Sequence, residues 1–111
     1  MPRYKLVVMT KPVEGREQEY NDWYQNVHLH DVVAIDAFKS ARRFRVSRSL
    51  APDPHPLPYL AIYDIETDDV DGAIKELMSR VASGQMHIST ALSEESIAAI
   101  YEDLGTVVNK R

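Results

Sequence analysis

Cysteine is absent from the sequence, which excludes disulfide bonds, thiol catalysis and cysteine-based metal sites. No apolar run approaches the roughly 20 residues that cross a bilayer, and the N-terminal MPRYKLVVMTK lacks the pattern of a signal peptide. Glycine-rich phosphate loops and dinucleotide fingerprints are also missing. The net charge of −4 argues against nucleic acid, whose phosphates favour a basic surface. We therefore expect a cytoplasmic protein with no cofactor, no nucleic-acid partner and no membrane contact.

The chain is short, and its composition is typical of globular proteins. Its 111 residues are 44% hydrophobic and 27% charged, which predicts one domain spanning residues 1–111. A domain of this size buries a limited core. Two helices would also leave one apolar face of a sheet uncovered, so we expect a homodimer.

Hydrophobic periodicity indicates three strands and two helices before residue 90. The strands are predicted at residues 3–11, 37–48 and 59–66, the first helix at residues 14–26, and a proline-rich loop at residues 51–58. The second helix carries Val70, Ile74, Leu77 and Val81, with Asp68 and Asp69 as its N-terminal caps and Gly84 after its end.

Two strands have side-chain patterns that predict how they are buried. In residues 37–48, Phe38, Phe44 and Val46 are expected on one face, with Lys39, Arg43 and Arg45 on the other. The run YLAIYDIE, residues 59–66, is expected to be buried on both faces.

The C-terminal segment is ambiguous from its local pattern. A helix capped by Ser93 would place Ile97, Ile100 and Leu104 on one side, whereas SIAAIYED also suits a strand. The order β-α-β-β-α before it favours a strand, because one more strand completes a ferredoxin-like fold. We therefore predict a strand at residues 98–103 and an α+β fold, β-α-β-β-α-β, with an antiparallel four-stranded sheet.

The segment KPVEGREQEYNDWYQNVHLHDVVAIDAFKSARRF resembles the dimeric α+β barrel proteins, in particular their EthD-like branch. The resemblance covers residues 4–48 well, and SGQMHISTAL fits it more weakly. His30 and His87 depart from the pattern, because proline is expected at both positions, whereas His28 matches it. The resemblance implies a two-fold dimer whose sheets close into a barrel, with an apolar pocket in each protomer. This superfamily includes polyketide cyclases, cofactor-free monooxygenases, muconolactone isomerases and haem-degrading enzymes.

His28 is the strongest candidate for chemistry. On a continuous helix, Tyr20, Tyr24 and His28 share a stripe, and Asp31 lies three residues further on. Asp31 would fix the tautomer of a neutral imidazole, which suits general acid–base work near pH 7. Tyr24 or Tyr63 would donate a hydrogen bond to an oxyanion. The alternative is a structural His28, packed under the sheet with its nitrogens bonded to backbone.

Metal binding by the H-x-H pair is not expected. Residues two apart on a helix point about 200° away from each other, so His28 and His30 would not share one ion. No further ligand with known spacing is present. His30 is therefore predicted to lie on the surface.

Other substrate-binding candidates each have a structural alternative. Trp23 would line the pocket or pack in the core or the dimer contact. Tyr59 and Tyr63 share one side of their strand, and so line the pocket or the core. An inward Arg43 or Arg45 would bind a carboxylate or phenolate, unless it forms surface salt bridges. In some relatives a histidine near the position of His87 works with a tyrosine in ring-closing chemistry.

The leading hypothesis is a cofactor-independent enzyme that acts on a small apolar oxygenated molecule, such as an aromatic, lactone or polyketide-like compound. His28 would transfer a proton in an isomerase, cyclase or lyase reaction. A cofactor-free or haem-dependent monooxygenase is the second hypothesis. A non-catalytic, ligand-binding accessory dimer of a catabolic pathway is the third.

Overall fold

A computed structural model describes residues 2–111 and contains one four-stranded antiparallel sheet. The elements in chain order are β1 (Arg3–Pro12), α1 (Glu17–Trp23), the π-helical η1 (Tyr24–His28), α2 (Leu29–Val33), β2 (Phe38–Arg45), β3 (Tyr59–Glu66), α3 (Val70–Ala82) and β4 (Leu92–Glu102). The strands are ordered β2-β3-β1-β4. The predicted ferredoxin-like α+β fold is confirmed, and so is a strand in the ambiguous C-terminal segment.

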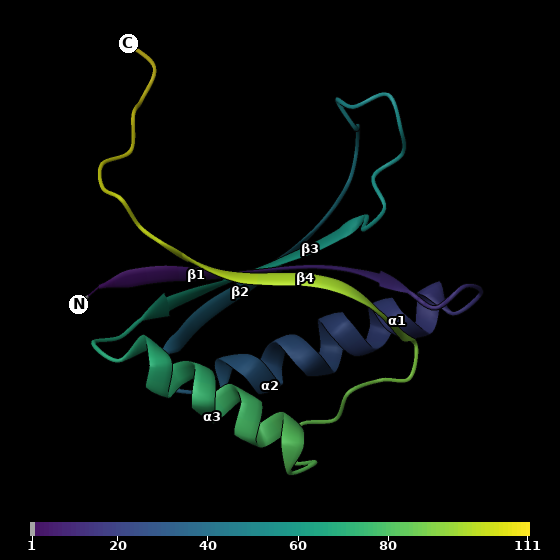
Figure 1. Cartoon of the computed structure of the whole chain (residues 1–111), viewed down its shortest axis with the longest axis horizontal. Coiled ribbons are helices and arrows are strands. Elements are labelled where there is room, and N and C mark those ends of the chain that lie inside the picture. The colour runs from purple at the N-terminus through teal and green to yellow at the C-terminus, as the bar shows by residue number, and fades with distance from the viewer. Residues whose placement is uncertain (1) are drawn as a thin grey trace.

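The sheet has one covered face and one open face. The helices all lie on the same side of it, whereas the β2–β3 loop and the C-terminal tail project on the other side (Figure 1). Along β3 the side chains alternate between buried and half-buried, so Tyr59 and Tyr63 face the helices and Leu60 and Ile62 do not. The prediction that this strand is buried on both faces is therefore not met within the single chain, because no second layer from residues 2–111 covers the open face.

A register shift in β2 overturns the predicted faces of that strand. Phe38 pairs with Ile65, but the pairing shifts between Phe38 and Ser40. Beyond the shift, Arg43 pairs with Ala61, which places Arg43 on the same face as Phe38 and Phe44 on the opposite one. One extra residue in a strand reverses the alternation of every residue after it.

The first helical segment is longer and less regular than predicted. It runs from residue 17 to residue 33, and its middle turn, Tyr24–His28, is π-helical. The N–H of Leu29 donates to the carbonyl of Tyr24, five residues earlier. Single π turns inside α-helices occur frequently at functional sites. The backbone at His28 is therefore wider than the α-helical geometry assumed from the sequence.

Helix α3 begins and ends where its sequence predicts. The Asp69 side chain accepts a hydrogen bond from the Gly72 N–H at 2.9 Å, which makes Asp69 the N-cap. Gly84 adopts a φ of 78° just after the helix, a conformation that suits glycine. None of the helices within residues 2–111 is long and apolar enough to cross a membrane.

Candidate functional site

An apolar cavity of about 370 Å³ lies between the covered face of the sheet and the helices. Strands β1 and β4 form its floor, and η1, α2 and α3 form its walls. No charged side chain from the described part of the chain lines it. Its lining residues are Leu6, Val8, Tyr24, His28, Val32, Phe38, Tyr63, Ile74, Leu77, Met78, Val81, Ile88, Ala98, Ala99 and Ile100.

His28 brings the one imidazole to this cavity wall. Its ring stacks on Trp23, with centroids 4.7 Å apart, and meets the Tyr24 ring edge-on at 5.1 Å. The Nδ1 atom is buried and has no hydrogen-bond partner among the described residues. An unsatisfied buried nitrogen costs about 1–3 kcal/mol. Because the His28 ring lines the cavity, a rotation of the ring would bring this nitrogen to a ligand or water molecule there.

The electrostatic environment keeps His28 neutral. Burial lowers the pKa of His28 from 6.5 to about 4, while the negative charge of Asp31 opposes that shift. Asp31 acts only through its charge, because no hydrogen bond joins it to His28 within residues 2–111. The expectation that Asp31 or a backbone carbonyl holds an imidazole nitrogen is therefore wrong for Nδ1. The ring can accept a hydrogen bond or a proton at pH 7.

Two tyrosine hydroxyls lie together on the same wall. Tyr63 donates a long hydrogen bond of 3.5 Å to the hydroxyl oxygen of Tyr24, and both side chains are buried. Burial raises the pKa of Tyr24 to about 12 and also raises the pKa of Tyr63. Both groups therefore stay protonated at neutral pH and remain hydrogen-bond donors. With Tyr63 directed at Tyr24, the Tyr24 hydroxyl proton is the one left for a ligand.

Trp23 supports the site and is not among the residues that line the cavity. The indole is buried, and its N–H donates to the carbonyl of His87 at 3.1 Å. Its ring is thereby fixed behind the imidazole of His28. The His87 side chain is exposed and does not line the cavity, so only its backbone belongs to this arrangement. His30 is exposed, as predicted.

Tyr59 and Arg45 lie away from the cavity. Tyr59 is buried on the same face as Tyr63, but its hydroxyl donates to the Glu17 carboxylate and accepts from the side chain of Asn21. Both Tyr59 and Arg45 line a separate polar hollow beside β2. Of the alternatives that the sequence left open for these two residues, the structure favours those outside the pocket of His28.

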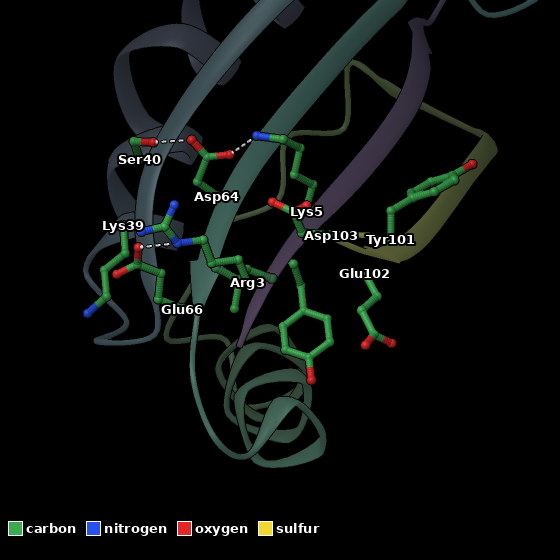
Figure 2. A pocket seen from close by; sticks show the side chains of 11 residues that line it. Arg3, Lys5, Lys39, Ser40, Asp64, Glu66, Tyr101, Glu102 and Asp103 are labelled. Atoms are coloured by element: carbon green, nitrogen blue, oxygen red, sulfur yellow. Dashed lines mark hydrogen bonds and ion pairs between the residues drawn. The ribbon is translucent and has the colours of Figure 1, made fainter. Parts of the chain in front are cut away.

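A third hollow, of about 480 Å³, lies where β1 begins and β3 and β4 end. Figure 2 shows Lys5 and Ser40 directed at Asp64 and Arg3 directed at Glu66, whereas Lys39 and Glu102 point away from these pairs. Lys5 and Ser40 both donate to Asp64, and Arg3 pairs with Glu66 at 3.3 Å. Because four of its charges are already paired with one another, this hollow offers less to a ligand than the apolar cavity does.

Sequence reasoning missed most of the far wall of the cavity. Ile74, Leu77 and Met78 of α3, together with Ile88 in the following loop, line it. The apolar spacing of α3 gave a signal, but that spacing equally predicts an ordinary core helix. The polar part of the wall, His28 with Tyr24 and Tyr63, contains the residues that the sequence indicated.

Comparison with known sequences matches only part of the chain. No family profile matches the chain. Core atranone cluster (CAC) protein 1 of Stachybotrys chlorohalonatus is 38% identical over 63 residues. That match covers 55% of this chain but 25% of the fungal protein, so the chain matches only about a quarter of that relative's length.

Solved structures extend the comparison to nearly the whole chain. A proposed monooxygenase of Shewanella loihica PV-4 has a TM-score of 0.62 at 14% identity and covers 96% of this chain and 99% of its own. A dimeric ferredoxin-like protein of unknown function from Thermobifida fusca has a TM-score of 0.55 at 9% identity, covering 91% of both chains. An EthD family protein of Bacillus halodurans C-125 has a TM-score of 0.50 at 14% identity, covering 94% of this chain and 100% of its own. The chain has the ferredoxin-like fold of these solved structures. Identities this low establish the fold and no activity.

Proposed function

We propose that the chain is a cofactor-independent enzyme that moves a proton on a small, apolar, oxygenated molecule bound in the cavity. The observation that carries this proposal is that His28, whose Nδ1 has no partner among the described residues, lines an otherwise apolar cavity. A neutral carbonyl or phenol compound suits the cavity, because no charged side chain of the described residues lines it. We propose the cytoplasm as its location.

The proposed step is proton transfer from a carbon next to a carbonyl group. The neutral imidazole of His28 accepts the proton, and the electron pair of the C–H bond moves to the carbonyl oxygen. The Tyr24 hydroxyl donates to the resulting enolate oxygen. Asp31 favours the imidazolium through its negative charge. Return of the proton to another carbon completes an isomerisation. Attack by the enolate carbon on a second carbonyl, whose oxygen then takes the proton back from the imidazolium, completes a cyclisation.

The pKa of about 4 restricts the substrate. A weakly basic imidazole efficiently removes a proton only from a carbon acid whose anion is well stabilised. Two carbonyl groups flanking one carbon, or an aromatic product, would supply that stabilisation. Polyketide-like and aromatic ketones therefore suit the site better than simple ketones.

We further propose that the protein works as a homodimer joined through the open face of the sheet. Apolar side chains gather on that face and are only partly covered by their own chain. Those on β1, β2, β3 and β4 are Val7, Met9, Phe44, Leu60, Ile62 and Ile97. A second copy would cover them and leave the cavity on the outer side of each sheet.

Hydrogen–deuterium exchange at carbon tests the proposed chemistry. Candidate β-dicarbonyl compounds, aromatic ketones and lactones are first screened for binding by the fluorescence of Trp23, the one tryptophan in the chain. For each compound that binds, loss of the proton next to the carbonyl in D₂O is followed by NMR. We expect exchange above the buffer rate, and a decrease of about 100-fold or more in His28→Gln, as for loss of a general base. The matched control His30→Gln should exchange like the original protein.

The competing functions give different results in the same experiment. Saturable binding without catalysed exchange would contradict the enzyme proposal and support a small-ligand-binding accessory protein. Oxygen consumption with a quinol would indicate a cofactor-free monooxygenase, a reaction class represented among the fold relatives by a proposed monooxygenase. Haem fits the cavity poorly, because the described lining has no cationic side chain to pair with its propionates.

A further inference from the structure

A polar hollow of about 410 Å³ lies between the first helical segment and the edge strand β2. It shares no lining residue with the apolar cavity, so it is a separate site. Its lining residues are Asn21, Asp22, Gln25, Asn26, Arg43, Phe44, Arg45 and Tyr59. Two arginines and three side-chain amides in one hollow provide many donors and few acceptors.

The guanidinium of Arg43 has no carboxylate partner within residues 2–111. Its centre instead lies 4.7 Å from the ring centroid of Tyr24 and 5.4 Å from that of Tyr59. Its Nη2 donates one hydrogen bond, at 2.6 Å, to the Asn21 side-chain oxygen. A guanidinium has five N–H donors, so most of its capacity for hydrogen bonds is unused by the protein. Arg43 is half-buried, which makes unmet donors costlier than on an open surface.

A relay of hydrogen bonds fixes Arg43 in this position. Asn21 accepts from Arg43 and donates through Nδ2 to the Tyr59 hydroxyl at 3.1 Å. The Tyr59 hydroxyl in turn donates to the Glu17 carboxylate. Because both ends of the Asn21 amide are occupied, its orientation is determined. The cation is therefore held in place before any ligand arrives, which reduces the entropy cost of binding.

The net positive charge of the hollow favours an anionic ligand. Arg43 and Arg45 contribute two positive charges and Asp22 one negative charge, which leaves one net positive charge in a protein whose total is −4. The ring of Tyr59 lies in the same wall, beside the guanidinium of Arg43. Arginine pairs well with the planar geometry of a carboxylate. We infer that this hollow binds a small organic monocarboxylate, with its carboxylate on Arg43 and Arg45 and its apolar part against Tyr59.

Titration with benzoate tests the inference, and does so independently of any activity at His28. In ¹⁵N NMR, the Nε–Hε signal of Arg43 and the side-chain amide signals of Asn21 and Gln25 should shift saturably, with a Kd of about 1 mM or below. Benzamide, which has the same shape without the charge, should leave these signals unchanged. No saturable shift up to about 50 mM benzoate would overturn the inference.

Three variants separate a built site from general surface charge. Arg43→Gln and Arg45→Gln should each weaken benzoate binding about 10-fold or more, as for loss of a charged hydrogen-bond partner. Arg42→Gln is the matched control, because it removes the same charge from the neighbouring residue, which pairs with Ile62 and lies on the open face. Arg45 is exposed, so its replacement preserves the fold even if Arg43→Gln does not. Equal weakening in all three variants, or equal shifts with chloride, would overturn the inference.

Discussion

The imidazole of His28 stacks on the indole of Trp23, with planes inclined by 27°. The indole is itself anchored, because its N–H donates to the carbonyl of His87. This relationship places the one tryptophan of the chain directly behind the candidate base. Trp23 is therefore an optical probe of both the charge of His28 and the contents of the cavity.

Trp23 fluorescence should report the protonation of His28. Burial lowers the pKa of His28 to about 4, so the ring next to the indole should become charged only near that pH. We expect a fluorescence change with a midpoint near pH 4, and its disappearance in His28→Gln. The imidazole signals in NMR provide the independent measurement. A midpoint between pH 6 and 7, an ordinary range for histidine, would contradict the burial of this ring.

The same pKa shift predicts how stability depends on pH. Because the pKa of His28 falls from 6.5 in the unfolded chain to about 4 in the folded one, the unfolded state binds more protons between these values. Folding stability must therefore decrease as the pH falls from about 7 towards 4. Between pH 7 and pH 5 the part due to His28 amounts to up to about 2 kcal/mol. Urea unfolding at both pH values should show that His28→Gln loses this part and that His30→Gln retains it.

Most of the fold could be predicted from the sequence, because the side-chain pattern of most elements agrees with their place in the topology. The boundaries of β3 and the caps of α3 follow from side-chain pattern and from Asp69 and Gly84. Strand β4 was predicted from topology against its helical periodicity, and topology was right because an antiparallel partner in β1 was available. It pairs with β1 through eight residue pairs, from Tyr4↔Glu102 to Pro12↔Leu92.

The errors came from features that no short pattern encodes. One extra residue in β2 moved Arg43 to the covered face, and a π turn altered the helix at His28. The cavity depends on how α3 sits over the sheet, which is decided by packing between distant segments. His28 and Tyr24 could be selected because they combine polar groups with a buried stripe. Asn21 could not, because its importance lies in contacts with Arg43 and Tyr59, distant in sequence.

The N-cap of α3 offers a stability test that is independent of the cavity. Asp69→Ala removes the acceptor of the Gly72 N–H and should lower the free energy of unfolding by about 1 kcal/mol. Asp68→Ala is the matched control, because it removes the same charge one residue earlier without a hydrogen bond to the helix. Denaturant unfolding of the two variants measures the difference. Equal losses would mean that the charge near the helix, rather than the cap, is what stabilises α3.

The oligomeric state tests the open face of the sheet. Ile97 lies there on β4 and is 58% exposed, and Met78 on α3 has the same exposed fraction on the helical side. Covering such side chains with a second copy contributes about 25 cal/mol for each Å² of apolar surface. We expect light scattering to give twice the 12.6 kDa mass of the chain at micromolar concentration, and a Tm that rises with protein concentration.

Matched substitutions locate the dimer contact on that face. A charge at position 97 would be buried without a partner between two sheets, so Ile97→Glu should weaken the dimer at least about 10-fold. Met78→Glu introduces the same charge at an equally exposed apolar position and should leave the dimer intact. If Met78→Glu dissociates the protein and Ile97→Glu does not, the copies meet through their helices. A 12.6 kDa species for the unmodified chain would reject the dimer itself.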